Sequence, residues 1–85
     1  MDYEIVWSPK AADELSSLTV ELRKRIAAKL ESVTGNPLRY LEYLQKYEIY
    51  KLRVGDWRVF VDLKHAEGVI DVLSIKHRSK AYSRL

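Results

Sequence analysis

The second half of the chain carries the pattern that most restricts its fold. From residue 48 onward, apolar and polar residues alternate with a period of two, which predicts strands near residues 48–54, 57–64 and 69–76. The dipeptide Gly55-Asp56 between the first two strands is typical of a two-residue hairpin loop. Because such a loop fixes which residues face each other, the register of this hairpin can be predicted.

The predicted register separates the side chains of the hairpin onto two faces. Arg53 should face Arg58, and Lys51 should face Phe60. One face is apolar and is expected to pack against helices; it carries Tyr50, Leu52, Val54, Trp57, Val59, Val61 and Leu63. The other face carries Ile49, Lys51, Arg53, Arg58, Phe60 and Asp62.

The first half of the chain predicts a strand followed by helices. Residues 2–7 alternate with a period of two and contain β-favouring residues, which indicates a strand. Ser8 and Pro9 are typical of the cap and the first position of a helix, which we place over residues 9–18.

A second helix is expected directly after the first. Thr19 can cap it, and its apolar stripe is made of Leu22, Ile26, Leu30 and Val33. Gly35, in a left-handed conformation, and then Pro37 are expected to end it. Residues 36–47 are apolar without a clean period, so we interpret them as a packed connection that can include a helical turn.

These elements predict one α+β domain over residues 1–85. The chain is too short for a second hydrophobic core, and it contains no internal repeat. The order β-α-α-β-β-β predicts a two-helix hairpin packed on one face of a mostly antiparallel four-stranded sheet.

The polar face of the hairpin indicates an anion site. Facing arginines, with Lys51 two residues away, repel each other, and a bound polyanion would relieve that repulsion. Arginine forks match phosphate oxygens, and an exposed Phe60 ring could stack on a base. The alternative is that Arg53 and Arg58 pair with acids such as Glu48, Asp56 or Asp62 and only solubilise the sheet.

The carboxyl-terminal end is the basic end of the chain. Residues 46–85 carry nine Lys/Arg against five Asp/Glu, and the last ten residues carry Lys76, Arg78, Lys80 and Arg84 with no acid. His77 could act as general acid or base, because histidine is the side chain suited to proton transfer near neutral pH, and Tyr82 could donate a proton or stack. Taken alone, a surface histidine of this kind is more often inert.

Composition excludes several classes of function. With no cysteine, the chain has no disulfide, thiolate metal site or cysteine nucleophile. No basic segment followed by a long apolar run opens the chain, and no apolar run approaches 18 residues. We therefore expect a cytoplasmic protein that neither is secreted nor spans a membrane.

Two segments resemble the RelE/ParE toxin superfamily: YKLRVGDWRV at residues 50–59 and IKHRSKAY at residues 75–82. The opening strand ending in Ser8-Pro9 and the order of elements also look like this family. The resemblance implies a RelE-like fold and a toxin of a type II toxin–antitoxin system. It further implies a metal-independent, cofactor-free endoribonuclease that cuts messenger RNA on the ribosome and is held by an antitoxin protein.

The resemblance also implies roles for individual residues. Lys51, Arg53 and Arg58 fall on the family's basic sheet positions, and Tyr82 on its C-terminal tyrosine. Lys76, His77 and Arg78 together cover its late basic position, without one being singled out. Arg58 would stabilise charge on the phosphoryl oxygens, Lys51 or His77 would accept the proton of the 2′-hydroxyl, and His77 or Tyr82 would protonate the leaving oxygen. The expected RNA contacts are Phe60, Lys76, Lys80 and Arg84.

One departure from the family pattern keeps other functions open. Ile49 stands where some RelE members carry a further lysine, so the basic cluster is thinner here. A ParE-like inhibitor of DNA gyrase without nuclease activity is one alternative. The other is a nucleic-acid-binding or inactive relative that only pairs with its antitoxin.

Overall fold

The computed structural model describes residues 2–81. Its elements in chain order are β1 (Glu4–Trp7), α1 (Pro9–Ser16), α2 (Val20–Val33), α3 (Pro37–Tyr40), β2 (Glu42–Leu44), β3 (Ile49–Val54), β4 (Trp57–Lys64), β5 (Val69–His77) and the short 3-10 helix η1 (Arg78–Lys80). The three predicted C-terminal strands are confirmed to within one residue at each end.

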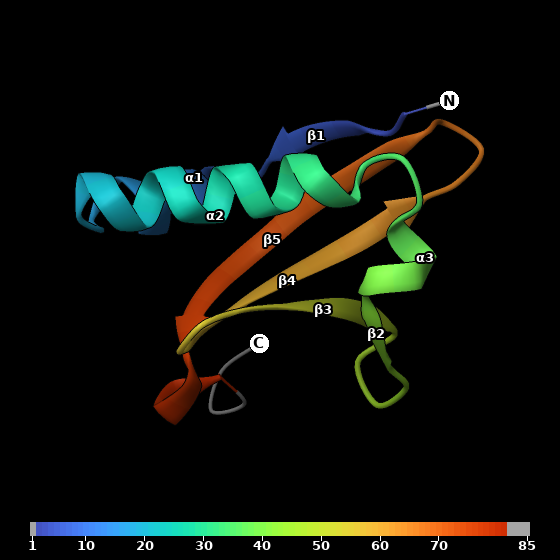
Figure 1. Ribbon diagram of the computed structural model, residues 1–85. Helices are drawn as coiled ribbons and strands as arrows, with labels where there is room; N and C mark the ends of the chain where they lie inside the picture. The colour runs from blue at the N-terminus through green and yellow to red at the C-terminus, as the bar shows by residue number, and fades with distance from the viewer. Residues whose placement is uncertain (1, 82–85) are drawn as a thin grey trace.

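The strands form one sheet in the order β1-β5-β4-β3-β2 (Figure 1). β1 runs parallel to β5, and the other neighbouring strands are antiparallel. The predicted α+β class and mostly antiparallel sheet are confirmed, but the sheet has five strands where we expected four. The additional strand is β2.

Strand β2 lies within residues 36–47, the stretch whose sequence shows no clean period. The expected helical turn is α3, and β2 then pairs with β3, placing Tyr43 opposite Tyr50 with ring centroids 5.1 Å apart. A strand of three residues is too short to show a period of two, which is why the sequence did not reveal it.

The hairpin of β3 and β4 has the predicted register. Val54 faces Trp57, Arg53 faces Arg58 and Lys51 faces Phe60. Gly55 adopts a φ of 59°, the left-handed conformation that a two-residue hairpin loop requires.

Helix capping agrees with the sequence at the amino-terminal ends of the first two helices. The Ser8 hydroxyl accepts a hydrogen bond from Ala11 N at 3.1 Å, and the Thr19 hydroxyl accepts one from Leu22 N at 3.3 Å. At the end of α2, the expected left-handed Gly35 is wrong, because the positive φ angles among residues 2–81 belong to Glu48, Gly55 and Gly68. The helix ends instead at Thr34, whose hydroxyl donates to Glu31 O at 2.8 Å.

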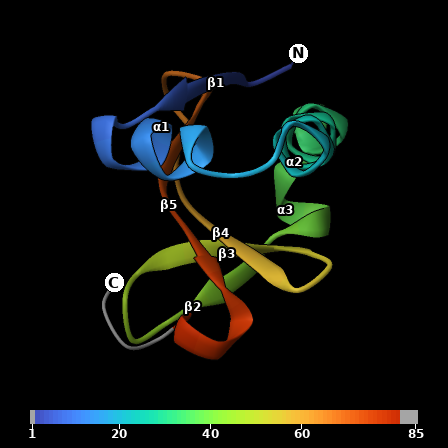
Figure 2. The ribbon, with the colours of Figure 1, turned by 90° about the vertical axis from the view of Figure 1, so that its left-hand side faces the viewer.

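Both long helices cover one face of the sheet, with α1 over β5 and α2 beside β3 (Figure 2). The core between them contains the buried residues Ala11, Ile26, Leu30, Val33, Leu41, Leu52, Val54, Val59, Val61, Leu63, Ile70, Val72 and Ile75. Tyr50 and Trp57 pack against it, so the predicted apolar face of the hairpin is confirmed. Among the described residues, no helix is long and apolar enough to cross a membrane.

Candidate nucleic-acid interface

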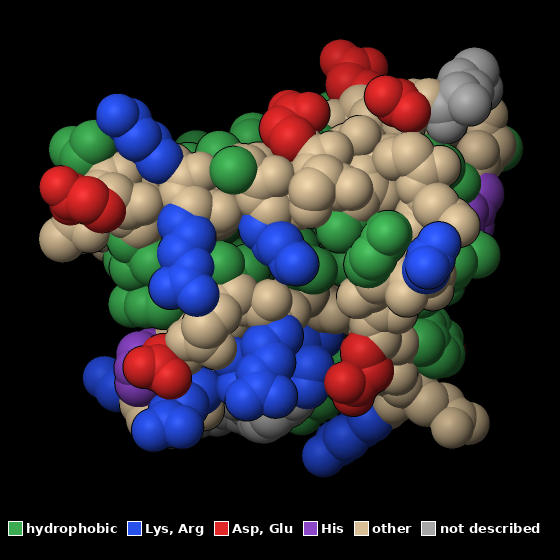
Figure 3. All heavy atoms as spheres, in the orientation of Figure 1, with side chains coloured by type: hydrophobic (Ala, Val, Ile, Leu, Met, Phe, Trp, Pro, Cys, Tyr) green, Lys and Arg blue, Asp and Glu red, His purple; other side chains and the backbone are tan. Residues whose placement is uncertain are grey.

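Three cations form a row across the face of the sheet that points away from the helices. Arg53 on β3 faces Arg58 on β4, and Arg58 in turn faces Lys76 on β5. Residues directly opposite each other in a sheet share a face, so these three side chains, the basic row, lie next to one another. Lys and Arg side chains gather in this region, in the lower half of Figure 3.

A register shift in β5 brings Lys76 onto this face. Val61 pairs with Val72, but the preceding residue of β4, Phe60, pairs with Ser74, so Leu73 is an extra residue in β5. Without the shift, Ile75 would lie opposite Arg58, and Lys76 opposite Trp57. The shift therefore buries Ile75 in the core and adds Lys76 to the basic row.

Arg58 is held in place by the hairpin turn beside it. Its Nη1 donates to Gly55 O at 2.9 Å and to Trp57 O at 3.0 Å. Within residues 2–81 its Nε and Nη2 form no hydrogen bond, so that side of the fork can take up an anion. Because the turn fixes the side chain, little ordering remains to be done when a ligand binds.

Among residues 2–81, Arg53 and Arg58 are not paired with acids, contrary to the solubilising alternative. Arg53 is exposed and forms no salt bridge or hydrogen bond within residues 2–81. Asp56, one of the acids considered as a partner, lies 3.7 Å from Arg78 Nε instead. The repulsion between the facing arginines is therefore uncompensated within the described chain.

Lys51 lies on the same face, two residues before Arg53. Its Nζ is 3.6 Å from Glu42 Oε1 on β2, and its side chain is only 15% exposed. Since the Glu42 side chain is 66% exposed, this ion pair contributes little to the free energy of unfolding.

Lys76 is tied to α1 through Glu14. Its Nζ lies 2.8 Å from Glu14 Oε2, while Glu14 Oε1 accepts from Ile75 N at 2.9 Å and from the Ser74 hydroxyl at 3.1 Å. Because β1 pairs with β5 only as far as Val72, Glu14 satisfies a backbone donor on the open edge of β5. Burial acts to raise the pKa of Glu14, but the hydrogen bonds and the Lys76 charge outweigh it and lower that pKa.

His77 lies on the opposite face of the sheet from the basic row. It faces Trp57, and the two rings meet edge to face with centroids 5.3 Å apart. Its Nδ1 accepts from Ser79 N at 3.3 Å, which caps η1, and lies 3.0 Å from the Ser79 hydroxyl. The structure thus separates His77 from Lys51 and Arg58, with which sequence reasoning grouped it.

The segment after β5 is hydrogen-bonded to the β3–β4 turn. Arg78 N donates to Asp56 O at 2.7 Å, and the Arg78 side chain lies near the Asp56 carboxylate. Lys80 ends η1 and is exposed. Tyr82 and Arg84 lie outside the described residues.

Phe60 is not exposed, so the expectation that its ring could stack on a base is wrong. The residue points away from the helices, as alternation predicted, but its exposed fraction is 0%. It lies beside a hollow of about 320 Å³ whose other residues are Lys10, Tyr47, Ile49, Leu73 and Ser74. Alternation predicts the face on which a side chain lies, whereas neighbouring segments decide whether water reaches it.

Together, the described residues form a cationic surface in which Arg58 is held by the turn and Lys76 by Glu14. No group of three or more His, Asp or Glu side chains within residues 2–81 is arranged to hold a metal ion. What the geometry provides is preorganised positive charge on one sheet face, with an arginine fork at its centre.

Comparison with known proteins places this surface in a toxin fold. A family model described as the ParE toxin of type II toxin-antitoxin system, parDE, matches residues 5–82. The chain belongs to this family, within the RelE/ParE toxin superfamily. No curated protein sequence matches the chain.

Solved structures show the same fold. The RelBE2 toxin–antitoxin complex of Mycobacterium tuberculosis contains a chain with 17% identity and a TM-score of 0.84, covering 92% of this chain and 100% of that one. The archaeal RelE–RelB complex of Pyrococcus horikoshii contains a chain with 23% identity and a TM-score of 0.79, and the match covers 95% of this chain and 100% of that one. A variant of the Escherichia coli toxin RelE in the free state has 24% identity and a TM-score of 0.79, and the match covers 98% of this chain and 90% of that one.

Proposed function

We propose that this toxin cleaves messenger RNA on the ribosome, using the basic row as its catalytic surface. The observation that carries the proposal is the row Arg53, Arg58 and Lys76, which is like-charged across three strands and positioned by the turn and by Glu14. The facing Arg53 and Arg58 have no acidic partner among residues 2–81, their repulsion destabilises the sheet, and a phosphodiester would remove that cost.

The reaction needs no group other than side chains and the RNA itself. The ribose 2′-oxygen attacks the adjacent phosphorus while its proton passes to a base, the bond to the 5′-oxygen breaks, and that oxygen is protonated. The products are a 2′,3′-cyclic phosphate and a 5′-hydroxyl end. Negative charge develops on the phosphoryl oxygens, opposite the unused side of the Arg58 fork.

The geometry narrows the assignment of proton transfers. Of the two bases considered from the sequence, Lys51 lies on the face of Arg58 and His77 does not. We therefore assign removal of the 2′-hydroxyl proton to Lys51 and protonation of the 5′-oxygen to Tyr82.

The test adds the purified protein to a translating extract and maps the ends of a reporter message, beside a tube without ribosomes. We expect cuts only where ribosomes are present. A second message carrying a 2′-deoxynucleotide at the mapped site should stay intact there. Cuts without ribosomes, or at the deoxynucleotide, would overturn the proposed reaction.

A second candidate function is inhibition of DNA gyrase. It is favoured by the ParE family match and by the pairing of Lys51 and Lys76 with carboxylates, which reduces the net charge of the surface. A supercoiling assay with the same preparation separates the two functions. Loss of gyrase activity with intact messages would select the gyrase inhibitor.

We also infer that an antitoxin protein binds this chain. Toxin–antitoxin complexes are among the structures that share its fold. An acidic or amphipathic segment laid over the basic row would neutralise its charge and block RNA. Co-expression with the product of a neighbouring small reading frame, followed by size-exclusion chromatography, tests this: co-elution supports it, and separate elution contradicts it.

A further inference from the structure

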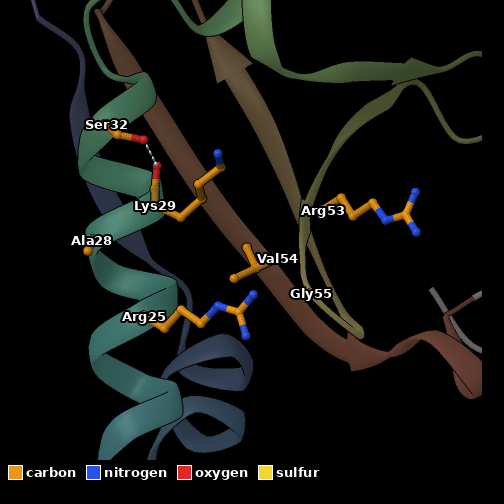
Figure 4. Close-up of a pocket in the computed structure, with 7 residues that line it drawn as sticks. All are labelled: Arg25, Ala28, Lys29, Ser32, Arg53, Val54 and Gly55. Atoms are coloured by element: carbon orange, nitrogen blue, oxygen red, sulfur yellow. Dashed lines mark hydrogen bonds between the residues drawn. The ribbon is translucent and has the colours of Figure 1, made fainter.

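A second cationic site lies between α2 and the end of the β3–β4 hairpin. The groove has a volume of about 480 Å³ and is lined by Arg25, Ala28, Lys29, Ser32, Arg53, Val54 and Gly55. Figure 4 shows Arg25 and Lys29 pointing from α2 toward the hairpin, while Arg53 points from β3 to the side away from α2.

The two walls of the groove approach closely at the turn. A Cβ built on Gly55 would lie 2.9 Å from Arg25 Nη2 and 3.0 Å from Nη1, so the guanidinium lies against the turn backbone. On the other wall, β2 pairs with β3 only from Ile49 to Lys51, which leaves the edge of β3 open at Arg53 and Val54. One ligand can therefore contact α2 and the hairpin together.

The charges in the groove are uncompensated within residues 2–81. Arg25 and Lys29 are four residues apart on α2, a spacing at which like charges repel. Neither they nor Arg53 takes part in a salt bridge among the described residues, and the groove is lined by no acid. Glu21, one turn before Arg25, does not pair with it. The fold therefore places Arg25 and Lys29 beside the hairpin and Arg53 on the adjoining wall, and none of the three has a counterion among residues 2–81.

We propose that this groove binds the phosphodiester backbone of RNA, as a continuation of the basic row around the edge of β3. The inference rests on the proposed function, which makes RNA the ligand. Arg53 connects the two sites, because it faces Arg58 across the hairpin and also lines the groove. A strand whose phosphate lies on Arg58 can thus pass Arg53 and place a further phosphate between Arg25 and Lys29.

The lining favours nucleic acid over an acidic peptide. Peptide segments draw most of their affinity from apolar side chains seated in pockets. The apolar side chains here are those of Ala28 and Val54, and Val54 is buried. The guanidinium groups of Arg25 and Arg53 and the ammonium of Lys29 match the oxygens of a phosphodiester instead, whereas the Ser32 hydroxyl already donates to Lys29 O.

The test measures binding by fluorescence anisotropy over a range of salt concentrations. The probe is a labelled 2′-O-methyl oligoribonucleotide of about 12 nucleotides, which cannot be cleaved through a 2′-hydroxyl. Each lost phosphate contact lowers the slope of log affinity against log salt by about 0.7, which is about fivefold in affinity at 0.1 M salt. We expect this change for Arg25→Gln and again for Lys29→Gln.

Lys24→Gln is the matched control. Lys24 is the exposed neighbour of Arg25 on α2 and does not line the groove, so it removes the same charge from the same helix. Its slope should stay at the wild-type value. Equal slopes for Lys24→Gln and Arg25→Gln would overturn the inference. So would a loss by Arg25→Gln confined to a labelled poly-glutamate peptide, which would identify a site for an acidic protein segment.

Message cleavage and probe binding together distinguish a failure of this inference from a failure of the proposed function. If wild-type protein cuts messages on ribosomes but Arg25→Gln binds the probe like Lys24→Gln, the groove has no role while the nuclease stands. If no message is cut but Arg25→Gln loses probe affinity, the groove binds RNA in a protein that is not a nuclease.

Discussion

Two neighbouring rungs of the β4–β5 ladder have opposite characters. Arg58 and Lys76 face each other on the side away from the helices, where they form part of a cationic surface. Trp57 and His77, one position further along, face each other on the helix side, where the rings pack together and Trp57 contacts the core. Adjacent residues in sequence thus differ in role because the pleat sends them to different faces. One rung belongs to the surface proposed to bind phosphate, and the other packs at the end of the sheet.

The largest effect is expected at Phe60, which marks where the cationic surface ends. It lies on the face of Arg58 but is fully buried. Phe60→Ala should therefore lower the free energy of unfolding by about 3–5 kcal/mol. Urea denaturation measures this. A loss below about 1 kcal/mol would mean that the ring is solvated and that the basic surface extends over it.

Lys76→Ala should reduce the rate of message cleavage by about tenfold to a hundredfold, because it removes one preorganised cation from the basic row. The rate is measured on programmed ribosomes. Lys64→Ala is the control, since Lys64 forms an exposed ion pair with Asp71 at the other end of β4. Equal rates for both variants would remove Lys76 from the site.

Glu14→Gln should lower the free energy of unfolding by about 1 kcal/mol at neutral pH, because the charged partner of Lys76 is lost. The folded protein lowers the pKa of Glu14 below its ordinary value of 4.5, so the stability it adds is present above about that pH. That contribution is lost as pH falls through the lowered value. The difference between wild type and variant, measured by urea titrations, should shrink as pH falls below 4.5. If the difference in free energy of unfolding stays constant with pH, the charge of the Glu14 carboxylate does not contribute to stability.

The smallest effect is expected at His77. His77→Ala removes the cap of η1 and the contact with Trp57, which should cost about 0.5–1 kcal/mol of stability. Cleavage should stay within about threefold of wild type, because the ring lies on the other face from Arg58. A loss of activity as large as that of Lys76→Ala would contradict the separation of the two rungs.

The sequence predicted the parts of the fold that local chemistry decides. A two-residue loop at Gly55-Asp56 determined the register of β3 and β4, and so the facing of Arg53 and Arg58. Ser8 and Thr19 located the helix starts because a hydroxyl cap acts within three residues.

What the sequence could not give depends on contacts between distant segments. The extra residue Leu73 shifts the register of β5, so no regular alternation could tell which of Lys76 and His77 joins Arg58. The burial of Phe60 and the pairing of Glu14 with Lys76 likewise depend on tertiary packing. The groove beside Arg25 was missed for the same reason, although Arg25 and Lys29 at a helical spacing of four were a signal that could have been followed.

The central claim is that Arg58, at the middle of the basic row, drives cleavage of messenger RNA on the ribosome. The most direct test is the single-turnover cleavage rate of a message on programmed ribosomes, for wild type and Arg58→Ala, with thermal unfolding as a check on folding. We predict a loss of about a hundredfold to a thousandfold with an intact fold. A folded Arg58→Ala protein that cuts at the wild-type rate would contradict the account.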